Sequence, residues 1–227
     1  MNFLIVNAGC RINGQGGTLS AAMVELAERT LKHHGHCVVV TDLNEPYVVA
    51  DEVKKILEAD VLIFQTPGWW MTTPWQLIKY EDDVFVSPEL CGGDGRTRSD
   101  PEKKYGSGGF LTNKRYVLST TWNAPLEAFT DPQQFFEGKG LDGLFMPFHK
   151  TMQFLGLKAY PSFMVNDVFK HPTIEADFKR WEAYLTEHFG QRLKYSACFT
   201  RRPACMDASP HAGFFLHIRQ LHKALSE

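Results

Sequence analysis

The stretch VLIFQTPGWWMTTPW, residues 61–75, runs from an uninterrupted apolar segment into a Pro-Gly turn and three tryptophans. Four apolar residues in succession are typical of a strand that is buried on both faces of a sheet. A loop normally runs over the surface, where a tryptophan side chain loses the benefit of burial. The sequence therefore predicts that these tryptophans either fill a core or form the wall of a pocket.

Similar apolar runs occur at residues 3–7, 37–40, 116–121 and 162–165, and helical periodicity occurs at residues 19–31, 51–59 and 173–189. In the second helix we expect Asp51 as the N-cap, with Val53, Ile56 and Leu57 facing inward. Buried strands that alternate with helices imply a parallel sheet covered on both sides. The predicted fold class is α/β, a flavodoxin-like, doubly wound, five-stranded parallel sheet with helices on both faces.

Three unusual loops follow the first, third and fourth predicted strands, at residues 9–17, 66–73 and 121–124. In a doubly wound sheet, ligands bind outside the carboxyl ends of the strands, near the point where the strand order reverses. Because these three loops all leave carboxyl ends, we expect them to converge at one edge of the sheet. This convergence predicts a binding site.

The composition of the loops indicates which ligand the site could take. Gly16, Gly17, Thr18 and Ser20 lie at a helix start, where free N–H groups favour a phosphate, although a strand-to-helix turn needs small residues in any case. The dinucleotide pattern GxGxxG is not met, because its last position is Leu19. The loops PGWWM and TTWNAP add flat aromatic surfaces, which could instead fill a helix–helix contact. A planar ligand with a phosphate, such as a flavin nucleotide, fits all three loops, and Trp75 is expected to be ordinary core.

The overall composition limits the other possibilities. The chain has 227 residues, 44% of them hydrophobic, and a net charge of -2, so we expect a globular protein with neither nucleic acid nor an anionic membrane as partner. We expect no signal peptide and no membrane span, because no apolar run is long enough. Five cysteines without CxxC spacing indicate reduced thiols and a cytoplasmic location.

Longer motifs carry a family resemblance. PGWWM, KYEDDVF, DGRTR, KKYGSGG, TWNAP and PFHK occur in this order between residues 67 and 150. Together they resemble the modulator of drug activity B family, which are flavodoxin-like NAD(P)H:quinone oxidoreductases that bind FAD in a homodimer. The resemblance runs to about residue 190, and it implies a reductase domain at residues 1–190 and an extension of unknown role at residues 191–227.

The resemblance also implies roles for individual residues. The FAD pyrophosphate would lie against the first loop, the isoalloxazine and ribityl groups against the second, and the polar edge of the ring against the third, with one further contact from KKYGSGG. These positions are, in order, Gln15, Gly17, Thr18, Leu19 and Ser20; Pro67, Gly68, Trp69 and Trp70; Thr121, Trp122, Asn123 and Ala124; and Tyr105. Asn123 would also act in the reaction itself, through backbone N–H groups that stabilise charge on the reduced cofactor.

The implied reaction is substituted-enzyme hydride transfer from NADPH or NADH to a quinone, at a site shared between the two subunits of a homodimer. His149 in PFHK is a candidate for quinone contact and proton supply, because imidazole titrates near neutrality. The alternative is that its ring hydrogen-bonds a loop carbonyl. Two other functions remain open at this point, an FMN-type electron carrier and an azo or nitro reductase. A flavin-bound interaction module is a third alternative.

The remaining features have ordinary explanations beside functional ones. The basic residues Arg96, Arg98, Lys103 and Lys104 could receive the 2′-phosphate of NADPH, or could belong to a solvated loop. The run Glu81, Asp82 and Asp83 is expected to form a hydrated helix end, and His33, His34 and His36 are expected to be solvated rather than metal ligands. In the extension we expect a short helix at residues 214–225 and incidental thiols at Cys198 and Cys205.

Overall fold

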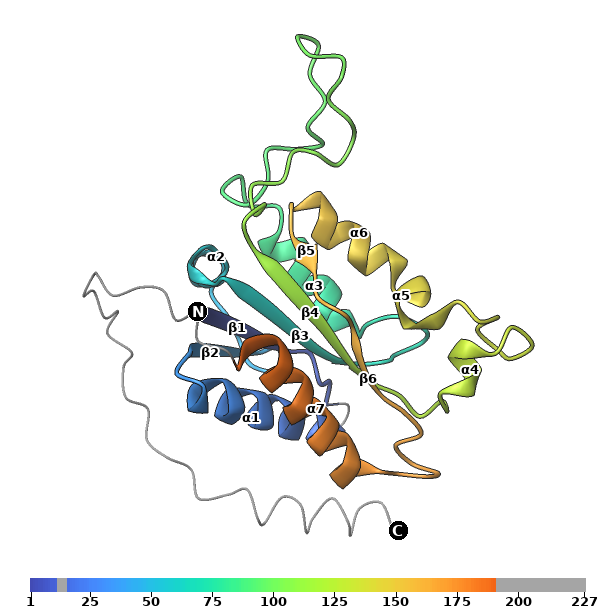
Figure 1. The fold of residues 1–227 in the computed structure, drawn as a ribbon. Coiled ribbons are helices and arrows are strands. Elements are labelled where there is room, and N and C mark those ends of the chain that lie inside the picture. The colour runs from blue at the N-terminus through green and yellow to red at the C-terminus, as the bar shows by residue number, and fades with distance from the viewer. Residues whose placement is uncertain (12–15, 191–227) are drawn as a thin grey trace.

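The computed structural model describes residues 1–11 and 16–190, and the expected contacts of Gln15 and all features of the extension lie outside these ranges. The strands are β1 (Asn2–Asn7), β2 (Cys37–Asp42), β3 (Val61–Pro67), β4 (Arg115–Thr121), β5 (Lys158–Ala159) and β6 (Phe163–Val165). All pairs are parallel, in the order β2-β1-β3-β4-β5, and β6 pairs with the carboxyl half of β4 (Figure 1). The predicted doubly wound parallel sheet is confirmed.

Seven helices cover the two faces of the described sheet: α1 (Thr18–His33), α2 (Val49–Glu58), α3 (Trp75–Val84), α4 (Glu127–Thr130), α5 (Gly140–Leu144), α6 (Met146–Phe154) and α7 (Ile174–Phe189). Helices α1 and α7 pack on one face, and α2 to α6 pack on the other (Figure 1). Because side chains alternate along a strand, Leu62 and Phe64 of β3 point to the second face while Val61 and Ile63 point to the first. This two-sided burial explains the continuous apolar run of β3.

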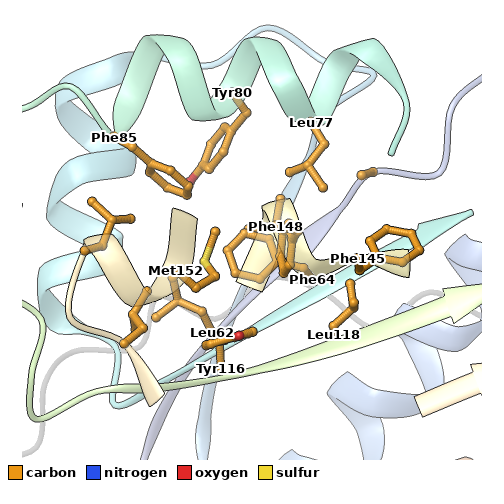
Figure 2. Close-up of a cluster of buried hydrophobic side chains, with 14 of the residues drawn as sticks. Leu62, Phe64, Leu77, Tyr80, Phe85, Tyr116, Leu118, Phe145, Phe148 and Met152 are labelled. Carbon is orange, nitrogen blue, oxygen red and sulfur yellow. The ribbon is translucent and has the colours of Figure 1, made fainter. Parts of the chain in front are cut away.

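The core on the second face is strongly aromatic. Tyr80 and Leu77 of α3 point toward Phe148 of α6 above the sheet, as Figure 2 shows. The Phe148 ring lies edge-on to Phe64, with the ring centroids 5.3 Å apart. On the inward side of α2, the buried carboxylate of Glu52 accepts hydrogen bonds from the Tyr80 hydroxyl, at 3.0 Å, and from the Thr41 hydroxyl. These contacts fix α3 and α6 over β3 and β4, whose carboxyl ends form the candidate site.

Several local predictions were wrong. Helix α2 begins at Val49 with Val48 as its N-cap, so Asp51 lies in the first turn instead of capping it. Leu57, which was expected to face inward, is exposed, whereas Val53 and Ile56 are buried as predicted. The fifth strand is divided into β5 and β6, because the chain leaves the β4 ladder between Ala159 and Phe163.

Residues 92–109, here called the arm, form a long excursion between α3 and β4 (Figure 1). Its two ends are joined at the base by an isolated bridge between Cys91 and Gly109, and by a hydrogen bond from the Gly92 N–H to the Gly108 carbonyl. The arm therefore leaves the body at the amino end of β4. None of the helices in the described ranges is apolar over enough length to cross a bilayer.

Candidate functional site

The three loops predicted to form a site do meet at the carboxyl edge of the sheet. The Ala8 N–H donates to the Gln65 carbonyl at 2.8 Å, which joins the loop after β1 to the end of β3. The Gly68 N–H donates to the Thr121 carbonyl at 2.9 Å, which joins the loops after β3 and β4. These bonds continue the β1–β3–β4 ladder into the loops, so the parallel register of the strands brings the loops together.

Gly68 is required where the second and third loops touch. A Cβ atom at position 68 would lie 2.3 Å from Cε2 of the Trp122 indole, well inside van der Waals contact. The indole is held from behind by Phe129, Phe136 and Phe145, each edge-on to it. The Trp122 side chain is therefore a buried support for the Pro67–Gly68 backbone, and its Nε1–H has no hydrogen-bond partner among the described residues.

The exposed tryptophan of the second loop is held in an unusual backbone conformation. Trp69 and Thr72 exchange two backbone hydrogen bonds, of 2.8 and 3.0 Å, which close a two-residue turn. Trp70 and Met71 form this turn with φ values of 47° and 61°, in the left-handed region that side chains other than glycine and asparagine rarely occupy. The Trp70 side chain is 83% exposed. A strained turn that presents a bare indole is typical of a binding surface.

The first loop leads into a helix that lacks a side-chain cap. Helix α1 begins at Thr18, with Gly17 as its N-cap at φ 76°, and there is no acidic residue in its first turn. A Cβ at Gly9 would lie 2.6 Å from Cβ of the buried Ser20, so the loop passes directly over the helix start. The positive end of the helix dipole with unfilled N–H groups suits a phosphate. The residues of the first loop that are described therefore fit the phosphate end of a flavin nucleotide.

The third loop offers backbone donors. In the part of the chain that the structure describes, neither the Asn123 N–H nor the Ala124 N–H donates a hydrogen bond. Asn123 is exposed and Ala124 is half-buried at the rim of the edge. Two free N–H groups beside flat aromatic surfaces fit the carbonyl-bearing edge of a planar heterocycle. The residues present therefore fit an isoalloxazine ring as well as a phosphate.

Two predicted site residues, Tyr105 and His149, lie away from the carboxyl edge of the sheet. Tyr105 is on the arm, 70% exposed, with its ring 5.6 Å from that of Phe154 at the end of α6. His149 lies on α6, where its Nδ1 is 2.6 Å from the hydroxyl of Tyr116 and its Nε2 is 3.2 Å from Oδ1 of Asp142. Tyr116 is the second residue of β4, so both predicted residues lie toward the amino end of that strand. Within one chain they do not join the carboxyl-edge site.

The His149 environment differs from the loop-carbonyl alternative. Its partners are side chains: the Tyr116 hydroxyl on β4 and the Asp142 carboxylate on α5. The neighbouring His149 ring holds the pKa of Asp142 below its usual range, and burial raises the pKa of Tyr116. The three side chains together join α5 and α6 to the sheet beside a cavity of about 550 Å³.

The chain matches the family described as "Flavodoxin-like fold" over residues 1–188. It belongs to this family. It is 42% identical over 192 residues to the NADPH:quinone oxidoreductase MdaB of Haemophilus influenzae, covering 84% of this chain and 100% of that one. An uncharacterized protein of Schizosaccharomyces pombe is also 42% identical over 192 residues, covering 84% and 98%. Both relatives therefore align over almost their whole length with most of this chain.

Solved structures show the same flavodoxin-like fold. One from Klebsiella pneumoniae, named as a candidate quinone reductase, has a TM-score of 0.66 at 22% identity and covers 83% of each chain. An FMN-dependent NADH-azoreductase from Bacillus anthracis, in complex with FMN, has a TM-score of 0.59 at 14% identity and covers 83% of this chain and 99% of that one.

Sequence reasoning missed two supports of the site. Asn44, after β2, donates from Nδ2 to the Gly9 carbonyl at 2.7 Å and accepts from the Arg11 N–H at 3.0 Å, which secures the first loop. Asn166 and Asp167, after β6, bond to the Ala124 carbonyl. Both sets directly follow strands at the carboxyl edge, and this position in the strand pattern was the signal that could have identified them.

Two side-chain predictions outside the site were also wrong. Trp75 was expected to be ordinary core, but it is 65% exposed at the start of α3. Glu81 was expected on a hydrated helix end, but it is largely shielded and its Oε1 has no partner among the described residues. Burial, with the neighbouring charge of Asp82, raises the pKa of Glu81 to about 7. Amphipathic spacing could not separate these residues, because the burial of each depends on which elements pack against α3.

Proposed function

We propose that this protein is an FAD-dependent NAD(P)H:quinone oxidoreductase that reduces quinones to quinols by substituted-enzyme hydride transfer. The observation that carries the proposal is the carboxyl edge itself. There an uncapped helix start, the Gly68–Trp122 contact and two free N–H groups form one surface. The 42% identity to a protein named NADPH:quinone oxidoreductase supports the choice of donor and acceptor.

The chain's own residues bind and orient in this proposal. The start of α1 holds the phosphates, the Pro67–Gly68 backbone over Trp122 supports the ring, and the Asn123 and Ala124 N–H groups hold its polar edge. Trp70 and Trp69 form an aromatic wall, against which a nicotinamide or a quinone can stack. A bound flavin supplies the redox chemistry, since it can take a hydride from NAD(P)H and pass two electrons to a quinone.

The decisive experiment is the visible spectrum of the purified full chain, before and after NADPH is added without oxygen. We expect a flavin band that bleaches with NADPH and returns when a quinone is added. Heating should release FAD, identified by chromatography against FMN. A protein that is colourless and binds neither added flavin would overturn the function, whereas release of FMN would overturn only the choice of cofactor.

We also propose that the protein is a homodimer whose site lies at the subunit interface. Apolar side chains next to the site are open to solvent, with Trp70 and Trp75 the largest. Tyr105 and His149, which were predicted to belong to the site, lie toward the opposite edge of the sheet in their own chain, so a second copy would have to bring them to it. The proposed unit is the 1–190 domain, with residues 191–227 as an extension of unknown role.

Light scattering on a sizing column tests the assembly. We expect a dimer for the native chain and monomers for Trp75→Glu, because a buried unpaired carboxylate opposes association. Val48→Glu is the matched control, since Val48 is 62% exposed at the N-cap of α2, beside the edge strand β2 and outside the loops after β3 and β4. A native monomer, or an equal effect of both variants, would contradict the proposed interface.

A further inference from the structure

The loop after β6 makes an unusual set of contacts with the donor loop after β4. Trp122 donates to the Val165 carbonyl at 2.8 Å, and the Val168 N–H donates back to the Trp122 carbonyl at 3.1 Å. The Ala124 carbonyl accepts from the Asp167 N–H and from Asn166 Nδ2, each at 3.2 Å. The segment Asn166–Asp167–Val168, here called the clamp, therefore occupies the carbonyl oxygens on both sides of Asn123.

The backbone of Asp167 makes this double contact feasible. Its φ of 50° lies in the left-handed region, which aspartate and asparagine tolerate better than other side chains. The chain turns there directly after β6, which Figure 1 places beside the carboxyl end of β4. As a result a main-chain donor and a side-chain donor converge on one carbonyl, whose two lone pairs can accept both bonds.

Because the peptide bonds are trans, these contacts determine the direction in which the free N–H groups of the loop point. All described peptide bonds are trans, so the C=O and N–H of each peptide unit point in opposite directions. The Trp122 carbonyl points toward Val168, and the Asn123 N–H in the same peptide unit therefore points away from the clamp. On the other side, the Ala124 carbonyl is fixed by Asn166 and Asp167. The peptide unit between Asn123 and Ala124 is thus held from both ends.

We propose that the clamp, and Asn166 above all, is the positioning element that presets the Asn123 and Ala124 N–H groups for the polar edge of the flavin. This inference rests on the proposed function and names residues that act through Ala124 without touching the cofactor. Donors held in place before binding need no rearrangement when negative charge develops on the ligand. Loss of the clamp should therefore weaken binding of the reduced flavin more than binding of the oxidised flavin.

The test compares Asn166→Ala with Asn2→Ala in the full chain. Asn2 is the matched control, because its Nδ2 also donates to a backbone carbonyl, that of Glu58 at 3.1 Å, but at the amino edge of the sheet. The measurements are the dissociation constant of the oxidised flavin and the two-electron potential of the bound flavin. For Asn166→Ala we expect reduced flavin to lose about tenfold more affinity than oxidised flavin, a potential lower by about 30 mV. Asn2→Ala should leave the potential unchanged.

A second variant separates positioning from folding. Asn166→Leu keeps the approximate shape of the side chain and removes the donor without adding a charge, so it should lower the potential in the same direction as Asn166→Ala. An unchanged potential in both Asn166 variants, or an equal shift in Asn2→Ala, would overturn the inference while leaving the proposed function in place. A native chain that binds no flavin would overturn both.

Discussion

The contact between Gly68 and Trp122 gives the sharpest prediction. In Gly68→Ala the new Cβ would lie 2.3, 2.4 and 2.5 Å from three atoms of the indole, more than 1 Å inside van der Waals contact at about 3.5–4.0 Å. The indole cannot retreat freely, because three phenylalanine rings pack around it. Gly68 is itself tied to Thr121. Overpacking of this kind costs about 1–3 kcal/mol.

For a domain of this size, such a loss corresponds to a fall in melting temperature of roughly 2–10 °C. The assays are thermal denaturation followed by circular dichroism, and the flavin affinity of the folded variant, which should fall because the ring support moves. Gly143→Ala is the control: Gly143 lies in α5 without a positive φ, and its new Cβ would approach only Cβ of Lys139, at 3.1 Å, a far milder contact that the gain in helix propensity should offset. It should be neutral or stabilising by up to about 1 kcal/mol.

The double variant Gly68→Ala/Trp122→Leu tests the cause of the effect. If the clash is responsible, the two substitutions should be less harmful together than the sum of the single effects, because the smaller side chain makes room for the methyl group. Strict additivity, or a Gly68→Ala protein that melts with the native protein and binds flavin equally well, would refute the reasoning.

Three further predictions follow from buried polar groups. His149→Ala should lower the unfolding free energy by about 1–3 kcal/mol, because the buried Tyr116 hydroxyl loses its partner, and flavin should stay bound. Slower quinone reduction by the folded variant would support proton supply by His149, and unchanged rates would contradict it. The pKa of Glu81 is raised to about 7, so the unfolded chain ionises first and native stability should fall between about pH 4.5 and 7. Glu81→Gln should abolish that fall, by about 1–3 kcal/mol in urea titrations at the two pH values, and parallel pH profiles would contradict it. Tyr80→Phe should cost about 1–2 kcal/mol by removing a donor to the buried Glu52 carboxylate, and an equally stable variant would contradict the network.

The sheet was predictable from the sequence because the apolar pattern that indicates a buried strand is local. Continuous apolar runs such as the one in β3 are typical of a strand covered on both faces, so each run indicates a strand without knowledge of its neighbours. The edge strand β2 departs from the expected burial, since Val39 within its apolar run is 48% exposed. The convergence of the loops followed in turn, since parallel strands place their carboxyl ends on one edge. The short strand β5 was missed because two residues, both exposed, carry no periodic pattern.

The site was less predictable, because its support comes from contacts between distant segments. Nothing in the letters PGWW indicates that Gly68 faces the indole of Trp122, or that Trp70 adopts a left-handed φ. His149 was predicted to contact the quinone and supply a proton, yet its position on α6 puts its ring against Tyr116, near the amino end of β4. A sequence motif identifies a residue, but only the fold determines whether that residue lies near the amino or the carboxyl end of a strand.

Two tryptophans of the site, Trp122 and Trp70, differ sharply in their exposure to solvent. Trp122 is buried behind the Pro67–Gly68 backbone, and its indole fills the space that a side chain at position 68 would need. Trp70 lies on the turn of the same loop and is almost fully exposed, at a cost in backbone strain. A loop that served packing alone would gain nothing from holding a large apolar side chain in solvent in a rare conformation. The rigid support behind the loop and the bare indole on its turn are both accounted for if a flat ligand completes the surface between the loops after β3 and β4.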